Sequence, residues 1–174
     1  MKVIQSSKAS PSGAGIVIGV VDTGIDWDHE DLRDALAVNK AEDINGSGRF
    51  EAWPSEQEID GISGDLNGID DDGNGMVDDV IGADFVDQEV RNIGDDRRFD
   101  AVPFDEHGHG TLVSGVIAAT KDNHKGIAGL AWGSRIRTIR AFDATGNAEE
   151  RNIASAIVYA AANNVDVLNM SFGD

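Results

Sequence analysis

Short apolar runs alternate with polar segments along the 174 residues of the chain. Residues 16–22 form a continuous, mainly β-branched run that closes in an Asp-Thr-Gly turn, which is typical of a strand buried on both faces of a parallel sheet. Later apolar runs of similar length predict further strands. The predicted strands are residues 16–22, 80–86, 135–142 and 165–172.

Two stretches between these strands have a helical pattern. Residues 110–120 carry apolar side chains nearly all round, which predicts a buried helix. Asn147, followed three residues later by Glu150, has the form of a capping box and predicts a second helix that ends near Ala162. Because predicted strands alternate with predicted helices, we expect a single α/β domain over residues 1–174 with a mainly parallel sheet.

The segment from residue 38 to residue 78 departs from this alternation. It is rich in Gly, Asn and Asp and has little apolar periodicity. Such a segment is too long for an ordinary connection, so it is either functional or disordered. We expect residues 1–15 to be a polar lead-in and residues 87–106 to be a charged loop.

Acidic residues outnumber basic residues by 32 to 14, which gives the chain a formal net charge of −18. This charge argues against binding to nucleic acids or anionic membranes and favours cations. The absence of cysteine excludes disulfides and thiolate metal sites. No apolar run reaches the ~18 residues needed to cross a membrane, and the first residues lack the apolar core of a signal peptide. We therefore expect neither nucleic-acid binding nor membrane insertion.

An aspartate and a histidine far apart in the sequence are the first candidates for catalysis. Asp22 closes the first predicted strand, and His109 stands between two glycines at the start of the first predicted helix. Sites of open α/β sheets lie at the carboxyl ends of the strands, and a carboxylate that orients an imidazole makes a general base. The alternative is that each block is structural, with Asp22 in a turn and His109 at a helix cap.

His107 and His109 also form a His-x-His pair that could bind zinc together with Asp22, as in a zinc hydrolase. Alternate histidines around a glycine more often reflect loop geometry, and no further His or Cys is well placed to complete such a site. The zinc hydrolase is therefore kept as an alternative.

Residues 65–79 contain six aspartates and two asparagines, which cannot crowd together without counterions. Among them, Asp70, Asp72 and Asn74 have the spacing of the first three ligands of a calcium loop. Ile81 stands where an EF-hand has its bidentate acid, so a standard EF-hand is excluded. A solvated acidic loop is the alternative. The predicted calcium ligands of this segment are Asp65, Asn67, Asp70, Asp72, Asn74 and Asp78.

Two blocks of the chain resemble the signatures of a known protease family. Val-Val-Asp-Thr-Gly-Ile-Asp around Asp22 and Gly-His-Gly-Thr-x-Val-Ser-Gly around His109 resemble the Asp and His blocks of the subtilisin-like serine proteases (subtilases, peptidase family S8). Residues 167–173 resemble the substrate-binding strand of that family, and the similarity extends over about residues 16–173. The resemblance implies a three-layer subtilisin-like α/β fold that is truncated after the substrate-binding strand.

By this resemblance, the chain would supply the base half of a serine endopeptidase. Asp22 would orient His109, and His109 would act as the general base toward a serine. The Gly-Thr-Ser-Met-Ala block that carries the family's nucleophile is not found in residues 1–174, so we expect the chain alone to be inactive. The residues that correspond to the family's substrate-binding segments are Gly146, Asn147, Ala148, Ser171, Phe172 and Gly173.

The resemblance also implies structural calcium, in the acidic insertion (residues 38–78) and at a second site formed by Asp31 and Asn123. The partners it implies are a polypeptide substrate in an extended conformation and a propeptide, and the location it implies is extracellular or in the cell envelope. The uncovered apolar strand at residues 165–172 predicts self-association of this chain alone. A calcium-binding pseudo-protease or interaction module is the alternative function.

Overall fold

The computed structural model of the chain describes residues 13–86 and 101–173. The predicted polar lead-in and charged loop therefore lie mostly outside the described residues. The elements along the chain are β1 (Val17–Asp22), the 3-10 helix η1 (Arg33–Ala35), β2 (Glu58–Ile59), β3 (Ile62–Ser63), β4 (Gly82–Asp84), α1 (His109–Ala118), β5 (Arg135–Arg140), α2 (Glu150–Ala162) and β6 (Val167–Asn169).

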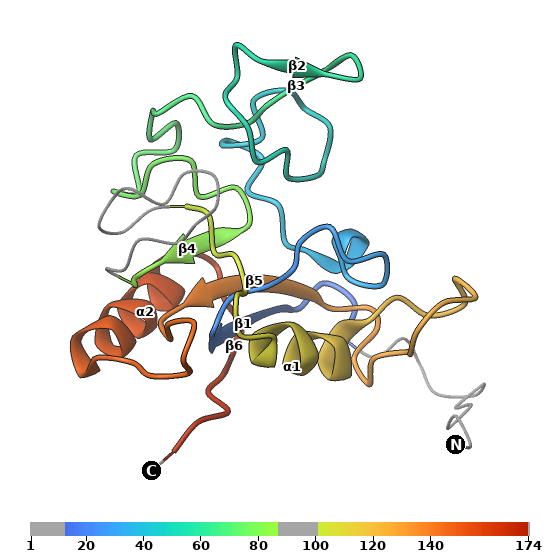
Figure 1. Cartoon of the computed structure of the whole chain (residues 1–174), viewed down its shortest axis with the longest axis vertical. Coiled ribbons are helices and arrows are strands. Elements are labelled where there is room, and N and C mark those ends of the chain that lie inside the picture. Colours follow the sequence, from blue (N-terminus) through green and yellow to red (C-terminus); the bar gives the residue numbers. More distant parts are fainter. Residues whose placement is uncertain (1–12, 87–100, 174) are drawn as a thin grey trace.

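The central sheet has four parallel strands in the order β4-β5-β1-β6 (Figure 1). β1 and β5 pair along their whole length, from Val17 opposite Arg135 to Asp22 opposite Arg140. Because all four strands run in the same direction, their carboxyl ends meet at one edge of the sheet, where Asp22 lies. The sheet confirms the predicted α/β fold with a mainly parallel sheet.

Hydrophobic side chains on the two faces of the sheet pack against different helices. Val20 and Ile136 belong to a buried cluster that includes Ala118 of α1. Val21 and Ile139, which point to the opposite face, belong to a second cluster with residues of α2. The sheet therefore lies between α1 and α2, which confirms the three-layer arrangement (Figure 1).

The two edge strands are shorter than their apolar runs predict. β4 covers three residues of the predicted strand 80–86, and β6 covers three residues of the predicted strand 165–172. Among the strands of residues 13–86 and 101–173, each of them pairs with one neighbour, β4 with β5 and β6 with β1. Each edge strand therefore has ladder pairing over three residues, although its apolar run continues.

The second helix begins later than the capping box predicts. α2 starts at Glu150, after a cap at Glu149 that makes no side-chain hydrogen bond. The backbone N–H of Asn147 instead donates to Asp143 Oδ1 at 3.0 Å, and its side chain donates to Thr145 Oγ1 at 2.7 Å. The prediction of an N-cap at Asn147 is wrong because the turn that follows Asp143 already engages this residue.

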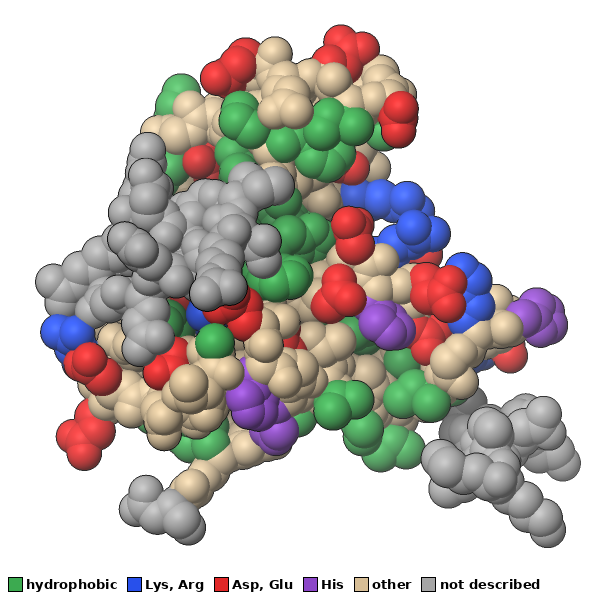
Figure 2. Space-filling model, viewed as in Figure 1, with side chains coloured by type: hydrophobic (Ala, Val, Ile, Leu, Met, Phe, Trp, Pro, Cys, Tyr) green, Lys and Arg blue, Asp and Glu red, His purple; other side chains and the backbone are tan. Residues whose placement is uncertain are grey.

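The prediction that α1 is buried nearly all round is also wrong. Leu112 and Val116 lie on its outer side and are 72% and 57% exposed, whereas Ser114 and Ala118 are fully buried. Within the described residues the sheet covers only one side of α1, and hydrophobic side chains are visible on its open side in Figure 2. No helix in the described part is long and apolar enough to cross a membrane.

Residues 38–78 form a lobe of loops beyond the sheet, here called the acidic lobe (Figure 1). β2 and β3 make a short antiparallel hairpin at its tip, which the sequence does not predict. Phe50 and Ala52 bury their side chains in the cluster that also contains Val20. Separate Asp and Glu side chains project from the outer surface of this lobe (Figure 2). The lobe is therefore attached to the domain core but holds a dense negative charge.

Candidate active site

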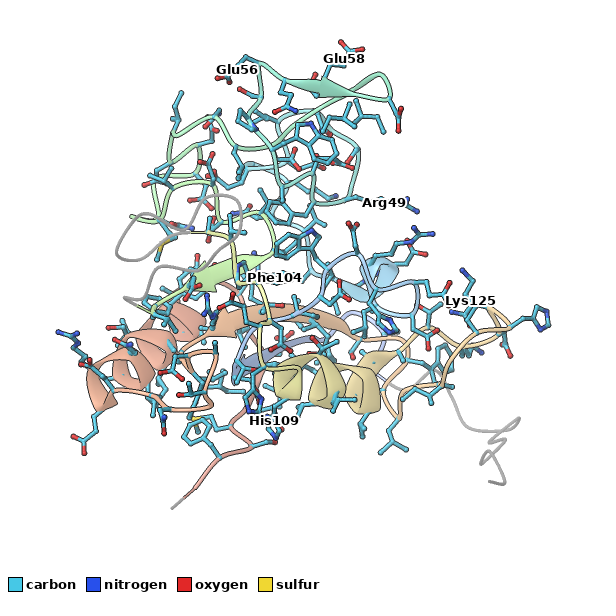
Figure 3. The ribbon with its side chains drawn as sticks, viewed as in Figure 1. Arg49, Glu56, Glu58, Phe104, His109 and Lys125 are labelled. Carbon is cyan, nitrogen blue, oxygen red and sulfur yellow. The ribbon has the colours of Figure 1, made fainter. Side chains whose placement is uncertain are left out.

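Asp22 and His109 meet at the carboxyl end of β1. Asp22 is the last residue of β1, His109 is the first residue of α1, and Asp22 Oδ1 lies 2.7 Å from His109 Nδ1. The side chain of Asp22 is 4% exposed, whereas that of His109 is 46% exposed. Figure 3 shows His109 at the start of α1. The buried carboxylate engages Nδ1, so Nε2 is the ring nitrogen left to exchange a proton with a group outside.

Two glycines allow the backbone segments around this pair to come together. Gly24 has a φ of 113°, and a Cβ atom there would lie 2.6 Å from the carbonyl oxygens of Pro103 and Phe104. A Cβ atom at Gly110 would lie 2.2 Å from the carbonyl oxygen of Gly24. A side chain at either position would push the start of α1 away from β1. The backbones of the Asp-Thr-Gly and His-Gly blocks therefore pack directly against each other.

Asp105 anchors the loop that leads into His109, and the sequence analysis missed it. Its carboxylate accepts hydrogen bonds from Thr23 Oγ1 at 2.7 Å, from Gly108 N–H at 2.7 Å and from Thr111 N–H at 2.8 Å. Burial acts to raise the pKa of Asp105, but the hydrogen bonds from Thr111 and Gly108 outweigh it and hold the pKa below its ordinary value. An acid shortly before a helix start is a capping signal that could have indicated this residue.

A cleft of about 280 Å³ opens beside the pair. Gly146 lies across from His107, since a Cβ atom there would be 3.2 Å from His107 Nε2. The predicted substrate residues Asn147 and Ala148 are not part of the lining, although they follow Gly146 directly. The residues that line the cleft are Asp22, Thr23, His107, His109, Phe142, Thr145, Gly146, Ser171, Phe172 and Gly173.

The geometry does not support a zinc site at the two histidines. The ring centroids of His107 and His109 lie 6.3 Å apart, and His109 Nδ1 is engaged by Asp22. Among the described residues, the ligand atoms of these three side chains do not form a group tight enough for one metal ion. His107 is instead a wall residue of the cleft.

One group of carboxylates, at the acidic lobe and directly after it, is close enough together to hold a single metal ion. Single oxygens of Glu42, Asp72 and Asp79 all lie within 4.8 Å of one another. Asn74 Nδ2 donates to Asp72 at 3.2 Å and to Asp79 at 3.0 Å. Glu42 Oε2 is buried and has no hydrogen-bond partner in residues 13–86 and 101–173. Burial is the main cause that raises the pKa of Glu42 to about 7 and raises that of Asp79.

The other predicted ligands of the segment make different contacts. Asp70 accepts hydrogen bonds from the three backbone N–H groups of the turn that follows it. Asp78 accepts the N–H of Asn67 at 2.8 Å, and Asp65 accepts the N–H of Glu51 at 2.7 Å. The structure thus separates residues that the sequence groups together. Glu42, which completes the dense group, lies 30 positions before Asp72, and no local spacing could have indicated it.

Asp31 and Asn123, the second predicted calcium pair, are in contact. Asn123 Nδ2 donates to Asp31 Oδ1 at 2.6 Å, and Ile127 N–H donates to Asp31 Oδ2 at 2.8 Å. Both oxygens of this buried carboxylate are therefore satisfied by N–H donors. The two predicted residues are thus brought together, and a calcium site at this pair stays a prediction.

The sequence model of the subtilase family matches residues 13–174. The chain belongs to the subtilase family. The match covers both the Asp22 block and the His109 block, so the two segments that meet in space are also the family's two signatures in this part of the sequence.

Curated relatives of this subtilase chain are much longer. A thermophilic serine proteinase of Bacillus sp. (strain AK1) is 39% identical over 94 residues, which cover 54% of this chain and 21% of the relative. Subtilisin-like protease 1 of Plasmodium berghei (strain Anka) is 34% identical over 155 residues, which cover 89% of this chain and 21% of the relative. The subtilase chain thus spans 21% of the length of both relatives.

A solved structure has the same fold. A protease from Pseudoalteromonas arctica PAMC 21717 matches with a TM-score of 0.61 and 21% sequence identity, over 94% of this chain and 43% of the other. At this identity the likeness concerns the fold. It agrees with the three-layer arrangement of the subtilase chain.

Proposed function

We propose that this subtilase chain supplies the acid and the base of an Asp-His-Ser triad in a serine endopeptidase. The observation that carries the proposal is the 2.7 Å contact between Asp22 Oδ1 and His109 Nδ1. In this mechanism Nε2 of His109 takes the proton of a serine hydroxyl as the serine attacks the scissile carbonyl. Asp22 holds the ring and stabilises the imidazolium, and His109 then passes the proton to the leaving amine.

The proposed substrate is a polypeptide in an extended conformation. Ser171, Phe172 and Gly173 continue the chain beyond β6 and line the cleft beside His109, while Gly146 lines its other wall. An extended peptide between these walls would add to the segment after β6 as a further strand, held by backbone hydrogen bonds. The small residues Gly146 and Gly173 leave room for that approach. Asn147 and Ala148 would extend the wall that begins at Gly146.

Peptide hydrolysis tests this function against the alternative of a calcium-binding pseudo-protease or interaction module. A polypeptide that carries this chain together with a serine block is expected to cleave a fluorogenic peptide and to be labelled by a fluorophosphonate at one serine. The 174-residue chain is expected to do neither. A folded longer polypeptide that fails both assays would favour the pseudo-protease, and robust cleavage by the 174-residue chain would contradict the triad.

We also propose that Glu42, Asp72 and Asp79 hold a structural calcium ion. Calcium takes about six to eight oxygen ligands, and three carboxylates with oxygens within 4.8 Å of one another fit that preference. The buried Oε2 of Glu42 has no hydrogen-bond partner within the described part of the chain, and such an ion would coordinate it. The hydroxyl of Tyr159 on α2 donates to Asp79 at 2.5 Å, so the ion would also fasten the acidic lobe to α2.

Calcium is expected to raise the melting temperature of the metal-free chain, and EDTA to reverse the change. An ion that binds only the folded state at about a hundred times its Kd should raise the midpoint by about 5–10 °C. Glu42→Gln should reduce this shift, whereas Glu58→Gln, at an exposed position of the same lobe, should keep it. Thermal unfolding followed by circular dichroism measures both. Equal shifts in the two variants, or no shift in the original chain, would contradict the Glu42 site.

An extracellular or cell-envelope location and self-association of the isolated chain are further proposals. A relative named cell wall-associated protease, from Bacillus subtilis (strain 168), is 39% identical over 69 residues, which supports the location. Val167, Met170 and Phe172 on and after the edge strand β6 are 52%, 47% and 39% exposed, which favours association through this edge. We propose a propeptide as a second partner, on the basis of the family resemblance alone.

A further inference from the structure

Asp105 lies at the centre of a hydrogen-bond network that joins the Asp22 block to the His109 block. One hydroxyl from each block donates to its carboxylate. Thr23 Oγ1 lies 2.7 Å from Asp105 Oδ1, and Thr111 Oγ1 lies 2.6 Å from Asp105 Oδ2. Asp105 and Thr23 are both buried, so water competes little for these contacts. The carboxylate is therefore in contact with both segments that carry the candidate catalytic pair.

Each of the two hydroxyls also accepts a backbone N–H from the opposite block. Gly110 N–H donates to Thr23 Oγ1 at 2.9 Å, and Asp26 N–H donates to Thr111 Oγ1 at 3.0 Å. A backbone N–H can only donate, so each hydroxyl is the acceptor in these two contacts and its single proton is left for Asp105. Thr23 and Thr111 thus hold the two blocks together reciprocally.

The network requires an ionised carboxylate at position 105. In addition to the two hydroxyls, this carboxylate accepts the backbone N–H groups of His107 at 3.1 Å, Gly108 at 2.7 Å and Thr111 at 2.8 Å. Every partner brings a proton, so a proton on either oxygen, or an amide in place of the carboxylate, would face another donor. Although burial acts to raise the pKa of Asp105, the hydrogen bonds from Thr111 and Gly108 hold that pKa below its ordinary value, which favours the ionised form.

We propose that Asp105 is a positioning residue for the general base His109, a role that rests on the Asp-His-Ser function proposed above. It acts through Thr23, which directly follows Asp22, and through Thr111, which follows His109 by two positions. Fixing these two threonines relative to each other keeps Asp22 Oδ1 at its distance of 2.7 Å from His109 Nδ1. Asp105 is not among the described residues that line the cleft, so it is not expected to touch the substrate.

The tautomer of His109 measures this positioning. A neutral imidazole carries its proton on Nδ1 or on Nε2, and the Asp22 carboxylate at Nδ1 selects the Nδ1–H form. Two-dimensional ¹H–¹⁵N NMR of the 174-residue chain, at a pH where the ring is neutral, gives the ratio of the two forms. We expect Asp105→Asn to lower the ratio of Nδ1–H to Nε2–H by about tenfold, the effect of losing one hydrogen bond. Thr120→Val, which removes a hydroxyl just after α1 and outside the network, should leave the ratio unchanged.

Thr23→Val and Thr111→Val separate positioning from the loss of a negative charge. Each removes one hydroxyl and leaves the charge of Asp105 in place, and each is expected to lower the same ratio by about threefold or more. These variants also carry the test where Asp105→Asn fails to fold, with circular dichroism as the check on folding. In a polypeptide that carries this chain together with a serine block, Asp105→Asn should reduce kcat by about tenfold or more while KM changes far less.

The positioning role would be overturned by an unchanged tautomer ratio in the folded variants, or by a native chain in which His109 carries its proton mainly on Nε2. A fall in Asp105→Asn without a fall in either threonine variant would show an effect of charge alone and would also overturn it, as would an active longer polypeptide whose kcat Asp105→Asn leaves unchanged. Failure of the protease function gives a different result. A folded longer polypeptide with the native residues would then fail to cleave peptides, whereas changing Asp105 would still lower the tautomer ratio in the 174-residue chain.

Discussion

Replacing His109 by alanine in a polypeptide that carries this chain together with a serine block is expected to reduce kcat by about 10⁶-fold, the size of the loss known for removal of the triad histidine from subtilisin. Asp22→Asn should cost about 10⁴-fold, because the amide no longer favours the proton on Nδ1 or stabilises the imidazolium. Steady-state kinetics on a fluorogenic peptide measure both losses. KM should change far less than kcat, since neither side chain is proposed to hold the ground-state peptide.

His124→Ala is the matched control for these variants. It removes an exposed histidine from the turn after α1. Its kinetics should equal those of the unaltered protease. Similar losses in His124→Ala and His109→Ala would indicate a general effect on folding, and undiminished activity of His109→Ala would exclude His109 as the general base.

Replacing Asp84 by alanine is expected to destabilise the domain by about 3–5 kcal/mol. Asp84 in β4 and Arg140 in β5 are each 1% exposed, and Arg140 Nη1 lies 2.6 Å from Asp84 Oδ2. Among the described residues, Asp84 is the closest countercharge of this buried guanidinium, and Glu106 follows at 3.8 Å, so removing the Asp84 carboxylate weakens the charge balance around Arg140. Since Arg140 stands opposite Asp22 in the strand register, the end of the sheet that carries the candidate site should loosen first.

Urea unfolding followed by circular dichroism measures this loss. Asp34→Ala is the control, because Asp34 pairs with Arg49 at 3.1 Å while both side chains are 53% exposed. Breaking such a pair should change the free energy of unfolding by no more than about 1 kcal/mol. Equal losses of unfolding free energy in the two variants would show that the buried Asp84 pair stabilises the domain no more than the exposed Asp34 pair does.

The contact between Asp22 and His109 can be predicted from sequence because each of the two residues lies in a local pattern. Asp22 closes an apolar run, and His109 opens a helical one between two glycines. Asp105 belongs to no such pattern, since its role depends on contacts with Thr23, 82 positions earlier, and with the start of α1. Its importance therefore becomes visible only when the two blocks are brought together.

In the acidic lobe, too, the contacts between distant residues cannot be predicted from local sequence patterns. Composition reveals that many carboxylates must share a small volume, but it does not show which of them meet. In the structure Asp72 joins Glu42, whereas Asp65 joins Glu51, although the sequence places Asp65 and Asp72 in one segment. The partition depends on how the chain folds back between these residues.

Sequence alone determines the alternation of strands and helices, the parallel sheet and the two signature blocks, because periodicity and turn residues act over a few neighbouring positions. The tertiary structure decides the features that depend on which surfaces other elements cover and on contacts between residues far apart in the sequence. It leaves one side of α1 open, limits β4 and β6 to three residues each, and draws Asn147 into the turn of Asp143. It also divides the carboxylates of the acidic lobe into two groups. These outcomes follow from which surfaces other elements cover, and no local pattern contains that information.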